Sequence, residues 1–127
     1  HNGSKTVEIW GTGKPMREFL HVDDMADACV FIMENVDAEK LYDDYKLSHI
    51  NIGTGVDITI GDLAIIVGKV VGFSGTLAFD ITKPDGTPRK LLDVTRLHQM
   101  GWKHSILLEE GIQRTYEWYL KAKAIRK

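Results

Sequence analysis

The strongest constraint on the fold is the recurrence of apolar residues every three to four positions in two separate stretches of the chain. One stretch covers residues 23–36, with two aspartates at its start, and the other covers 59–72. This spacing places the apolar side chains on one face of an α-helix, which is stabilised mainly by packing that face against another element. Helices are therefore expected in both stretches, and further patterns predict two more helices over 93–100 and 109–125.

Local signals define the ends of the helix expected after residue 59. The hydroxyl of Thr59 can accept a hydrogen bond from the amide three residues on, and Asp62 is placed to reach back as in a capping box. Gly72 is a suitable C-terminal stop because glycine readily adopts a left-handed backbone conformation.

Short extended segments are expected between the helices. Strands are predicted at 6–10, 17–22, 49–53 and 77–81. The polar segment 37–48 predicts an exposed loop or a loose helical turn, and 83–90 predicts a rigid loop with two prolines. Because strands and helices follow one another without regular β-α alternation, we expect an α+β (mixed α/β) fold rather than a complete doubly wound domain.

Composition bounds the class of protein. The chain has 127 residues, 43% of them apolar and 27% charged, which suits one folded domain over 1–127 and excludes intrinsic disorder. No apolar run approaches the ~18 residues of a membrane helix. A single cysteine excludes an intrachain disulfide and a four-thiolate zinc site. The opening residues contain no initiator Met, apolar signal core or Arg-rich presequence, so we expect a piece of a longer chain.

Charge is distributed unevenly along the sequence. The net charge of −2 gives no reason to expect nucleic acid or an anionic membrane as partner. Residues 1–62 carry 5 basic and 12 acidic side chains, whereas residues 63–127 carry 11 basic and 6 acidic ones. An anionic ligand is therefore expected to contact the second half.

Several motifs have a plain structural interpretation. The stretch GTGVDI at 53–58 resembles a dinucleotide-binding turn, but Ile58 replaces its third glycine, so a strand–turn–helix without cofactor is favoured. Tyr42 and Lys46 spell the Tyr-x-x-x-Lys pair of short-chain dehydrogenases. They lie in a polar, acidic stretch where the aspartates between them favour a neutral tyrosine, so this match is interpreted as chance.

The remaining histidine, aspartate and cysteine residues do not suggest a metal site. His21, Asp23 and Asp24 are interpreted as a helix entry with its cap, and no third and fourth ligand follows at useful spacing. Cys29 lies on the predicted apolar helix face, so it is expected to be a small buried hydrophobe rather than a nucleophile.

An aromatic side chain and basic side chains flank two glycine- and proline-containing turns. Trp10 and Arg17 bracket the first turn, and Lys83, Arg89 and Lys90 flank the second. Arginine can bind phosphate oxygens through paired hydrogen bonds, and an aromatic plane can hold a base or sugar. A nucleotide diphosphate is one interpretation, and an ordinary solvated basic surface is the other.

Three longer stretches carry a resemblance to a known family. They are WGTGKPMREFLHVDDMADA, SHINIGTGVDITIGDLA and KPDGTPRKLLDVTRLHQMGW. The first two resemble motifs found across nucleotide-sugar epimerases and dehydratases, and the third is particular to GDP-L-fucose synthases. From about Val7 to the last helix, the chain resembles the C-terminal portion of this family of NADPH-dependent epimerase/reductases, which are extended short-chain dehydrogenases.

The resemblance implies five substrate-binding residues. The family's tryptophan and arginine match Trp10 and Arg17, and its basic loop residue matches Lys90. Arg17 and Lys90 would neutralise the GDP diphosphate, and Trp10 would pack beside the nucleotide sugar. Asp85 would accept a hydrogen bond from a hydroxyl or from the guanine edge, and Ile9 would line the same pocket.

The resemblance also implies what this segment lacks. It implies a C-terminal substrate-binding part, with elements that complete the Rossmann domain of a cytoplasmic enzyme converting GDP-4-keto-6-deoxy-D-mannose to GDP-L-fucose. NADPH and the catalytic residues would belong to the N-terminal portion, so no catalytic, cofactor-binding or metal residue is expected here and the segment alone would be inactive. Cys29 and His21 inherit no acid–base role, because their surrounding motifs do not match.

Partners and alternatives follow from the same resemblance. The expected partners are a GDP-sugar, the protein's own N-terminal domain and a second copy in a homodimer, without nucleic acid or membrane. Alone, the segment is expected to self-associate or to expose an apolar patch. The alternatives are a non-catalytic nucleotide-sugar-binding module and a different nucleotide-sugar epimerase or dehydratase of the same superfamily.

Overall fold

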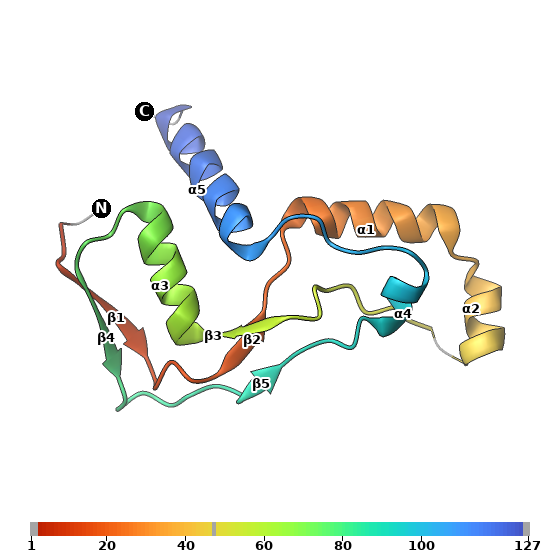
Figure 1. Ribbon diagram of the computed structural model, residues 1–127, viewed down its shortest axis with the longest axis horizontal. Helices are drawn as coiled ribbons and strands as arrows, with labels where there is room; N and C mark the ends of the chain where they lie inside the picture. Colours follow the sequence, from red (N-terminus) through yellow and green to blue (C-terminus); the bar gives the residue numbers. More distant parts are fainter. Residues whose placement is uncertain (1–2, 47, 126–127) are drawn as a thin grey trace.

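Two small sheets and five helices lie along an elongated molecule in the computed structural model, which describes residues 3–46 and 48–125 (Figure 1). The elements are β1 (Thr6–Trp10), β2 (Met16–Glu18), α1 (Val22–Asn35), α2 (Ala38–Tyr45), β3 (Asp57–Thr59), α3 (Ile60–Val71), β4 (Thr76–Asp80), β5 (Arg89–Lys90), α4 (Thr95–Gln99) and α5 (Leu108–Ile125). The mixture of strands and helices expected from the sequence is observed, as a mixed α/β fragment.

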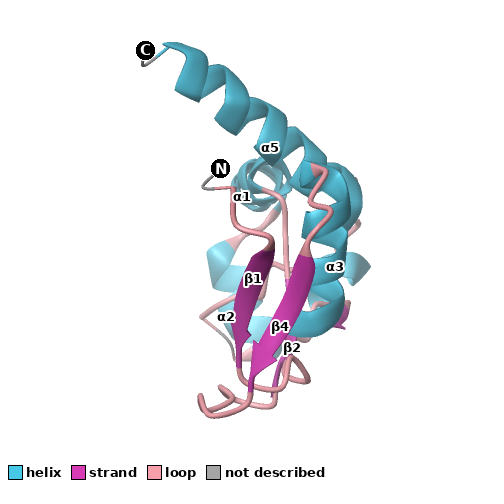
Figure 2. Cartoon of the chain, turned by 90° about the vertical axis from the view of Figure 1, so that its left-hand side faces the viewer, coloured by secondary structure: helices cyan, strands magenta, loops and turns pink. Residues whose placement is uncertain are grey.

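The first sheet pairs β1 with β4 in parallel, at one end of the molecule (Figures 1 and 2). Ile9 is the register partner of Phe79, and Trp10 is the partner of Asp80. Side chains alternate between the two faces of a strand, so Ile9 and Trp10 point to opposite faces. Ile9 lies on the face next to α3, where it lines an apolar cavity with residues of that helix.

The second sheet has the order β3-β2-β5 and joins three segments that are distant in the sequence. β2 is antiparallel to β3, with Arg17 opposite Ile58, and parallel to β5, with Arg17 beside Lys90. Its face opposite Arg17 carries an ion pair across the sheet. There the Arg89 guanidinium donates two hydrogen bonds to the Asp57 carboxylate.

The apolar core lies at the other end, among α1, α4 and the segment after α4. Ala28, Leu97 and Trp102 form its buried cluster, and the indole Nε1 of Trp102 donates to Asp27 at 2.7 Å. Partly buried side chains packed on this cluster are Leu20, Phe31, Ile32, Ile50 and Ile52. The core thus includes Leu20, which follows β2, and Ile50 and Ile52, which precede β3.

The structure confirms the sequence signals predicted for the helix ends. Thr59 is the N-cap of α3, and its Oγ1 accepts from the Asp62 amide at 3.0 Å. The Asp62 carboxylate accepts from the Thr59 hydroxyl rather than from its backbone. Gly72 ends the helix in the left-handed conformation with a φ of +69°. His21 caps α1 by accepting from the Asp23 amide at 3.2 Å.

Two segments in the middle of the chain differ from expectation. The segment 37–48, expected to be an exposed loop or a loose helical turn, contains the regular eight-residue helix α2, because the Asp37 carboxylate accepts from the Glu39 amide and caps its start. The segment 49–53 is not a strand. Ile50 and Ile52 instead pack on the apolar core, which satisfies their side chains without a strand partner.

Further corrections concern the ends of two segments. The predicted strand 17–22 ends at Glu18, because His21 caps α1 and Val22 already belongs to that helix. The predicted loop 83–90 ends in the two-residue strand β5. A two-residue strand has no alternation of its own that a sequence pattern could reveal.

Cys29 is exposed, contrary to the expectation that it is buried. α1 packs on the core through Asp24, Ala28 and neighbouring positions, which leaves Met25, Cys29 and Met33 on an outward face. Met33 is 85% exposed. The expected exposed apolar surface is therefore present on α1, and α3 likewise has no fully buried residue. No helix in the described part of the chain is long and apolar enough to span a membrane.

Candidate functional site

Arg17 and Lys90 lie side by side although they are far apart in the sequence. They are register partners on the parallel ladder between β2 and β5. Neighbouring strands lie about 4.8 Å apart and register partners direct their side chains to the same face, so both cations project from one face. Like charges in neighbouring positions repel each other unless an anion lies between them. This pair is therefore a suitable place for an anionic ligand.

Local contacts orient the Arg17 side chain. Its Nη1 donates to the Met16 carbonyl at 2.6 Å, and its Nη2 lies 3.1 Å from the position that a Cβ on Gly86 would take. Gly86 therefore lets the 83–88 loop approach the guanidinium closely. Lys90 is exposed, and Arg17 is half-buried.

Asp85 joins this loop to the turn after β1. Its Oδ1 accepts from the Thr12 amide at 2.8 Å, and its Oδ2 accepts from the Thr12 hydroxyl at 2.7 Å. These hydrogen bonds hold the pKa of the Asp85 carboxyl below its ordinary value of 3.8, so it is ionised at neutral pH. Gly11, with a φ of +84°, lies directly against the carboxylate, and any side chain there would overlap it. The two oxygens expected to face a ligand are thus used to hold the two loops together.

Trp10 is the last residue of β1 and precedes the turn that Asp85 contacts. Its ring is 70% exposed, its Nε1 donates to the Glu8 carboxylate at 3.0 Å, and the Lys83 Nζ lies 5.7 Å from the ring centroid. A large exposed indole with a cation beside it suits contact with a planar, negatively charged ligand. Trp10 is followed in the chain by Gly11 and Thr12. Thr12 is hydrogen-bonded to Asp85, and Gly86, the next residue, lies close to the Arg17 guanidinium.

Ile9 does not join the other four predicted residues. It lines the cavity of about 640 Å³ between α3 and the β1–β4 sheet, on the face of β1 opposite Trp10. The structure therefore brings Arg17 and Lys90 together directly and connects Trp10 and Asp85 to them through the two loops. Ile9 belongs to a different surface.

Glu18 is a polar residue of this region that the sequence patterns did not single out. Its Oε1 accepts from the amides of Thr54 and Gly55, each at 2.6 Å, and from the Thr54 hydroxyl at 3.2 Å. Its Oε2 accepts from the Leu92 amide at 3.1 Å. The glycine-rich turn that resembles a phosphate-binding turn thus holds a carboxylate of its own chain.

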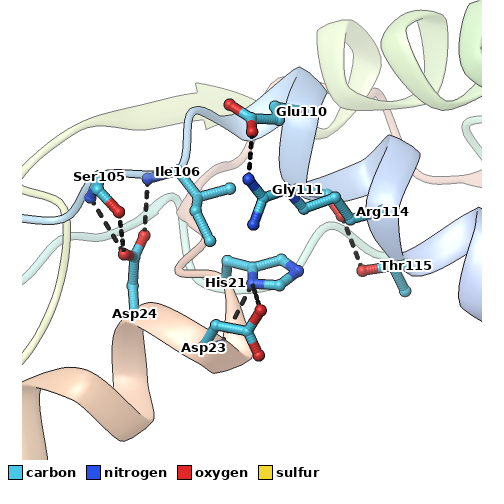
Figure 3. A network of polar contacts seen from close by, with 9 residues as sticks. All are labelled: His21, Asp23, Asp24, Ser105, Ile106, Glu110, Gly111, Arg114 and Thr115. Carbon is cyan, nitrogen blue, oxygen red and sulfur yellow. Dashed lines mark hydrogen bonds and ion pairs between the residues drawn. The ribbon is translucent and has the colours of Figure 1, made fainter.

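A second carboxylate, that of the buried Asp24, anchors the segment before α5 (Figure 3). Asp24 accepts from the Ser105 amide and hydroxyl at 3.1 and 2.9 Å and from the Ile106 amide at 2.9 Å. Burial disfavours its ionised form, but these hydrogen bonds outweigh burial and hold the pKa of Asp24 below 3.8. Gly111 of α5 packs against the His21 ring. This network is structural, since both oxygens of Asp24 are taken up by the chain.

The other sequence motifs form no site. Tyr42 and Lys46 lie on and just after the exposed helix α2, where the Lys46 Nζ is 5.6 Å from the Tyr42 ring centroid. Tyr42 is exposed and lacks the packed surroundings that a catalytic tyrosine needs. Across residues 3–46 and 48–125, no three His, Cys, Asp or Glu side chains are grouped as a metal ion would require.

Comparisons with known proteins indicate which families the chain resembles. Residues 1–53 match the model of the NAD dependent epimerase/dehydratase family. GDP-L-fucose synthase of Escherichia coli K12 is 60% identical over 116 residues, which cover 91% of this chain and 36% of that protein. The crystal structure of a GDP-6-OMe-4-keto-L-xylo-heptose reductase from C. jejuni matches with a TM-score of 0.86 and 49% identity, over 92% of this chain and 34% of that one. The GDP-mannoheptose C4 reductase from Campylobacter jejuni with NADP bound matches with a TM-score of 0.79 and 49% identity, over 90% of this chain and 34% of that one.

The chain is a mixed α/β fragment whose structure matches part of the extended short-chain dehydrogenase epimerases and reductases. More particularly, it is a homologue of the GDP-L-fucose synthases, and its residues 1–53 match the NAD dependent epimerase/dehydratase family. The similarity to GDP-L-fucose synthases that its motifs indicate is confirmed. The chain spans about a third of the length of these relatives.

Proposed function

We propose that this chain is the part of a GDP-L-fucose synthase that binds the GDP portion of the substrate. In the whole enzyme, GDP-4-keto-6-deoxy-D-mannose would be converted to GDP-L-fucose by epimerisation and NADPH-dependent reduction. The chain would be the C-terminal substrate-binding segment and would be inactive alone. The observation that carries this proposal is the placement of Arg17 beside Lys90 on one face of the second sheet.

The two cations would act on the diphosphate. A guanidinium and an ammonium on neighbouring strands can bind the oxygens of adjacent phosphate groups, and each hydrogen bond between charged groups is stronger than a neutral one. Trp10, at the edge of the same loop pair, would pack beside the nucleotide sugar. Holding the diphosphate and base in this way would place the reacting sugar ring in a fixed position, which lowers the barrier of the chemical step.

NADPH would be bound outside this chain. The turn at 53–55 is poorly suited to a dinucleotide, because the amides of Thr54 and Gly55 already donate to the Glu18 carboxylate. The cofactor would supply the hydride for the reduction. We assign its site to the N-terminal portion of the whole enzyme. The related C. jejuni reductase has NADP bound.

The partners would be this N-terminal portion and a second copy of the enzyme. Apolar side chains are exposed on the outward faces of α1 and α3, which supports a contact with a partner that would cover them. Val22 and Met33 mark the two ends of the exposed stripe on α1.

The test is calorimetric titration of the chain and its Arg17→Ala variant with GDP. The variant is expected to lose about 1.5–3 kcal/mol of binding free energy, the range for a hydrogen bond to a charged group. Lys121→Ala, which removes a cation from the exposed side of α5, is the matched control and should bind GDP as the unchanged chain does. Equal affinity of both variants for GDP would contradict the proposal.

Titration with UDP and dTDP separates this proposal from its superfamily alternative. A GDP-L-fucose synthase segment should prefer GDP, whereas a different epimerase or dehydratase should prefer another nucleotide. The reading frame upstream of residue 1 separates an enzyme segment from a free-standing binding module. A glycine-rich turn and a helical Tyr-x-x-x-Lys in that frame are expected.

A further inference from the structure

Glu18 links three segments of the chain through one carboxylate. It lies on β2 directly after Arg17, and because side chains alternate along a strand it faces away from Arg17. One oxygen accepts from the amides of Thr54 and Gly55, and the other accepts from the amide of Leu92. The carboxylate therefore connects the central strand, the glycine-rich turn and the residues that follow β5.

The turn is shaped around this carboxylate. Two successive backbone amides aimed at one oxygen form a small anion-binding concavity. Gly53 leaves the space that the carboxylate occupies, since a side chain there would overlap the Glu18 oxygens. Gly55, with a φ of +74°, adopts the left-handed conformation that turns its amide toward Glu18.

The link to Leu92 is one of the contacts that hold the segment containing Lys90. β5 consists of only two residues, too few for the ladder alone to fix its register. It is held on one side by the ion pair of Arg89 with Asp57 and on the other by the Leu92 amide on Glu18. Lys90 lies between these two attachments.

We propose that Glu18 is a positioning residue of the diphosphate site, which holds Lys90 beside Arg17 from the opposite face of the sheet. The inference rests on the proposed function. Glu18 does not touch the ligand, since its carboxylate is on the far face and is engaged by the three amides. Its loss should weaken binding of the diphosphate group and leave binding of the nucleoside unchanged.

The experiment compares the chain with its Glu18→Gln variant, using inorganic pyrophosphate, GDP and guanosine as ligands. Glutamine keeps one acceptor oxygen for the turn but presents an amide group, which cannot accept, to the Leu92 amide. We expect at least a tenfold loss of affinity for pyrophosphate and GDP, with guanosine affinity changed less than twofold. Glu34→Gln, at an exposed position on α1, is the matched control and should bind all three ligands as the unchanged chain does.

Amide hydrogen exchange gives a direct second readout. In Glu18→Gln the Leu92 amide should exchange at least tenfold faster, while the amides within α1 keep their rates. If Glu18→Gln does not fold, Glu18→Asp replaces it. The shorter side chain retains the charge but cannot span from the turn to Leu92, and it should show the same selective loss.

The outcomes separate the inference from the proposed function. If the unchanged chain does not bind GDP or pyrophosphate, the proposed function fails. If it binds both and the Glu18 variants bind pyrophosphate equally well, the inference is overturned. Loss of guanosine affinity in parallel with GDP would show a general structural role and would also overturn it.

Discussion

At the scale of single residues, the carboxylates contribute most to holding distant segments together. Asp24, Asp57 and Asp85 each accept hydrogen bonds from a segment far away in the sequence, and each has a pKa held below its ordinary value of 3.8. For Asp57 the main cause is the hydrogen bonding of the Arg89 guanidinium. A carboxyl with a lowered pKa in the folded state stabilises that state above pH 3.8. This contribution is lost as the pH falls through the folded-state pKa.

The first prediction concerns Asp24. Asp24→Asn should reduce the free energy of unfolding at pH 7 by about 1–3 kcal/mol, because the amide cannot accept every hydrogen bond that the buried carboxylate accepts. Because asparagine does not titrate, the free energy of unfolding of the variant should also fall less below pH 3.8 than that of the unchanged chain. Urea unfolding at pH 7 and at pH 3 measures both effects. Asp43→Asn on the exposed α2 is the control, and an equal effect there would contradict the prediction.

At the scale of elements, the helices follow local signals. The cap at Thr59 and the stop at Gly72 are both contained within the helix sequence and its immediate neighbours, so the limits of α3 could be predicted. Strands depend on partners that a local pattern does not contain. The segment 49–53 has a strand-like composition and packs on the core instead, while β3 and β5 are too short to carry a pattern.

The second prediction tests the cap of α3. Thr59→Ala removes the oxygen that accepts from the Asp62 amide and should lower the free energy of unfolding by about 1 kcal/mol. Thermal and urea unfolding measure the change. Thr6→Ala, at an exposed position on β1, removes the same atoms from a site without a cap. A loss as large in Thr6→Ala would show that the effect does not come from capping.

At the scale of the whole molecule, apolar surface is left uncovered on several elements. A groove of about 660 Å³ lies between α3, α5 and the segment that enters α1, and it is lined mainly by apolar and aromatic side chains. The outward stripe of α1 adds Val22, Met25 and Met33. An exposed apolar area of this kind normally marks a contact with another part of a protein or with another chain.

The third prediction follows from this surface. The isolated chain should self-associate, and Met33→Glu should raise the dissociation constant about tenfold or more, because burying a methionine side chain contributes roughly 1.5–3 kcal/mol. Sedimentation velocity over a range of concentrations measures the association. Lys121→Glu, a charge change on the exposed side of α5, is the comparison. A chain that sediments as a monomer at all concentrations would contradict the prediction.

In the candidate site, too, some features follow from the local sequence and others from contacts between segments that are distant in the sequence. The residue types at Trp10, Arg17 and Lys90 allowed either a diphosphate site or a solvated basic surface, and the family resemblance selected the first interpretation and these residues. Their arrangement depends on a two-residue strand, whose register no sequence pattern contains. The use of Asp85 to join two loops and the exposure of Cys29 both follow from packing between segments distant in the sequence.

The close contact between Gly53 and the Glu18 carboxylate limits the substitutions that this chain tolerates at position 53. Because the Glu18 oxygens fill the position where a side chain would begin, even alanine there would push the carboxylate off the turn. The displaced carboxylate would then no longer be held at the Leu92 amide, so the effect would extend to the residues after β5. Positions 18 and 53 are therefore coupled, because the carboxylate of one fills the space that the other leaves open.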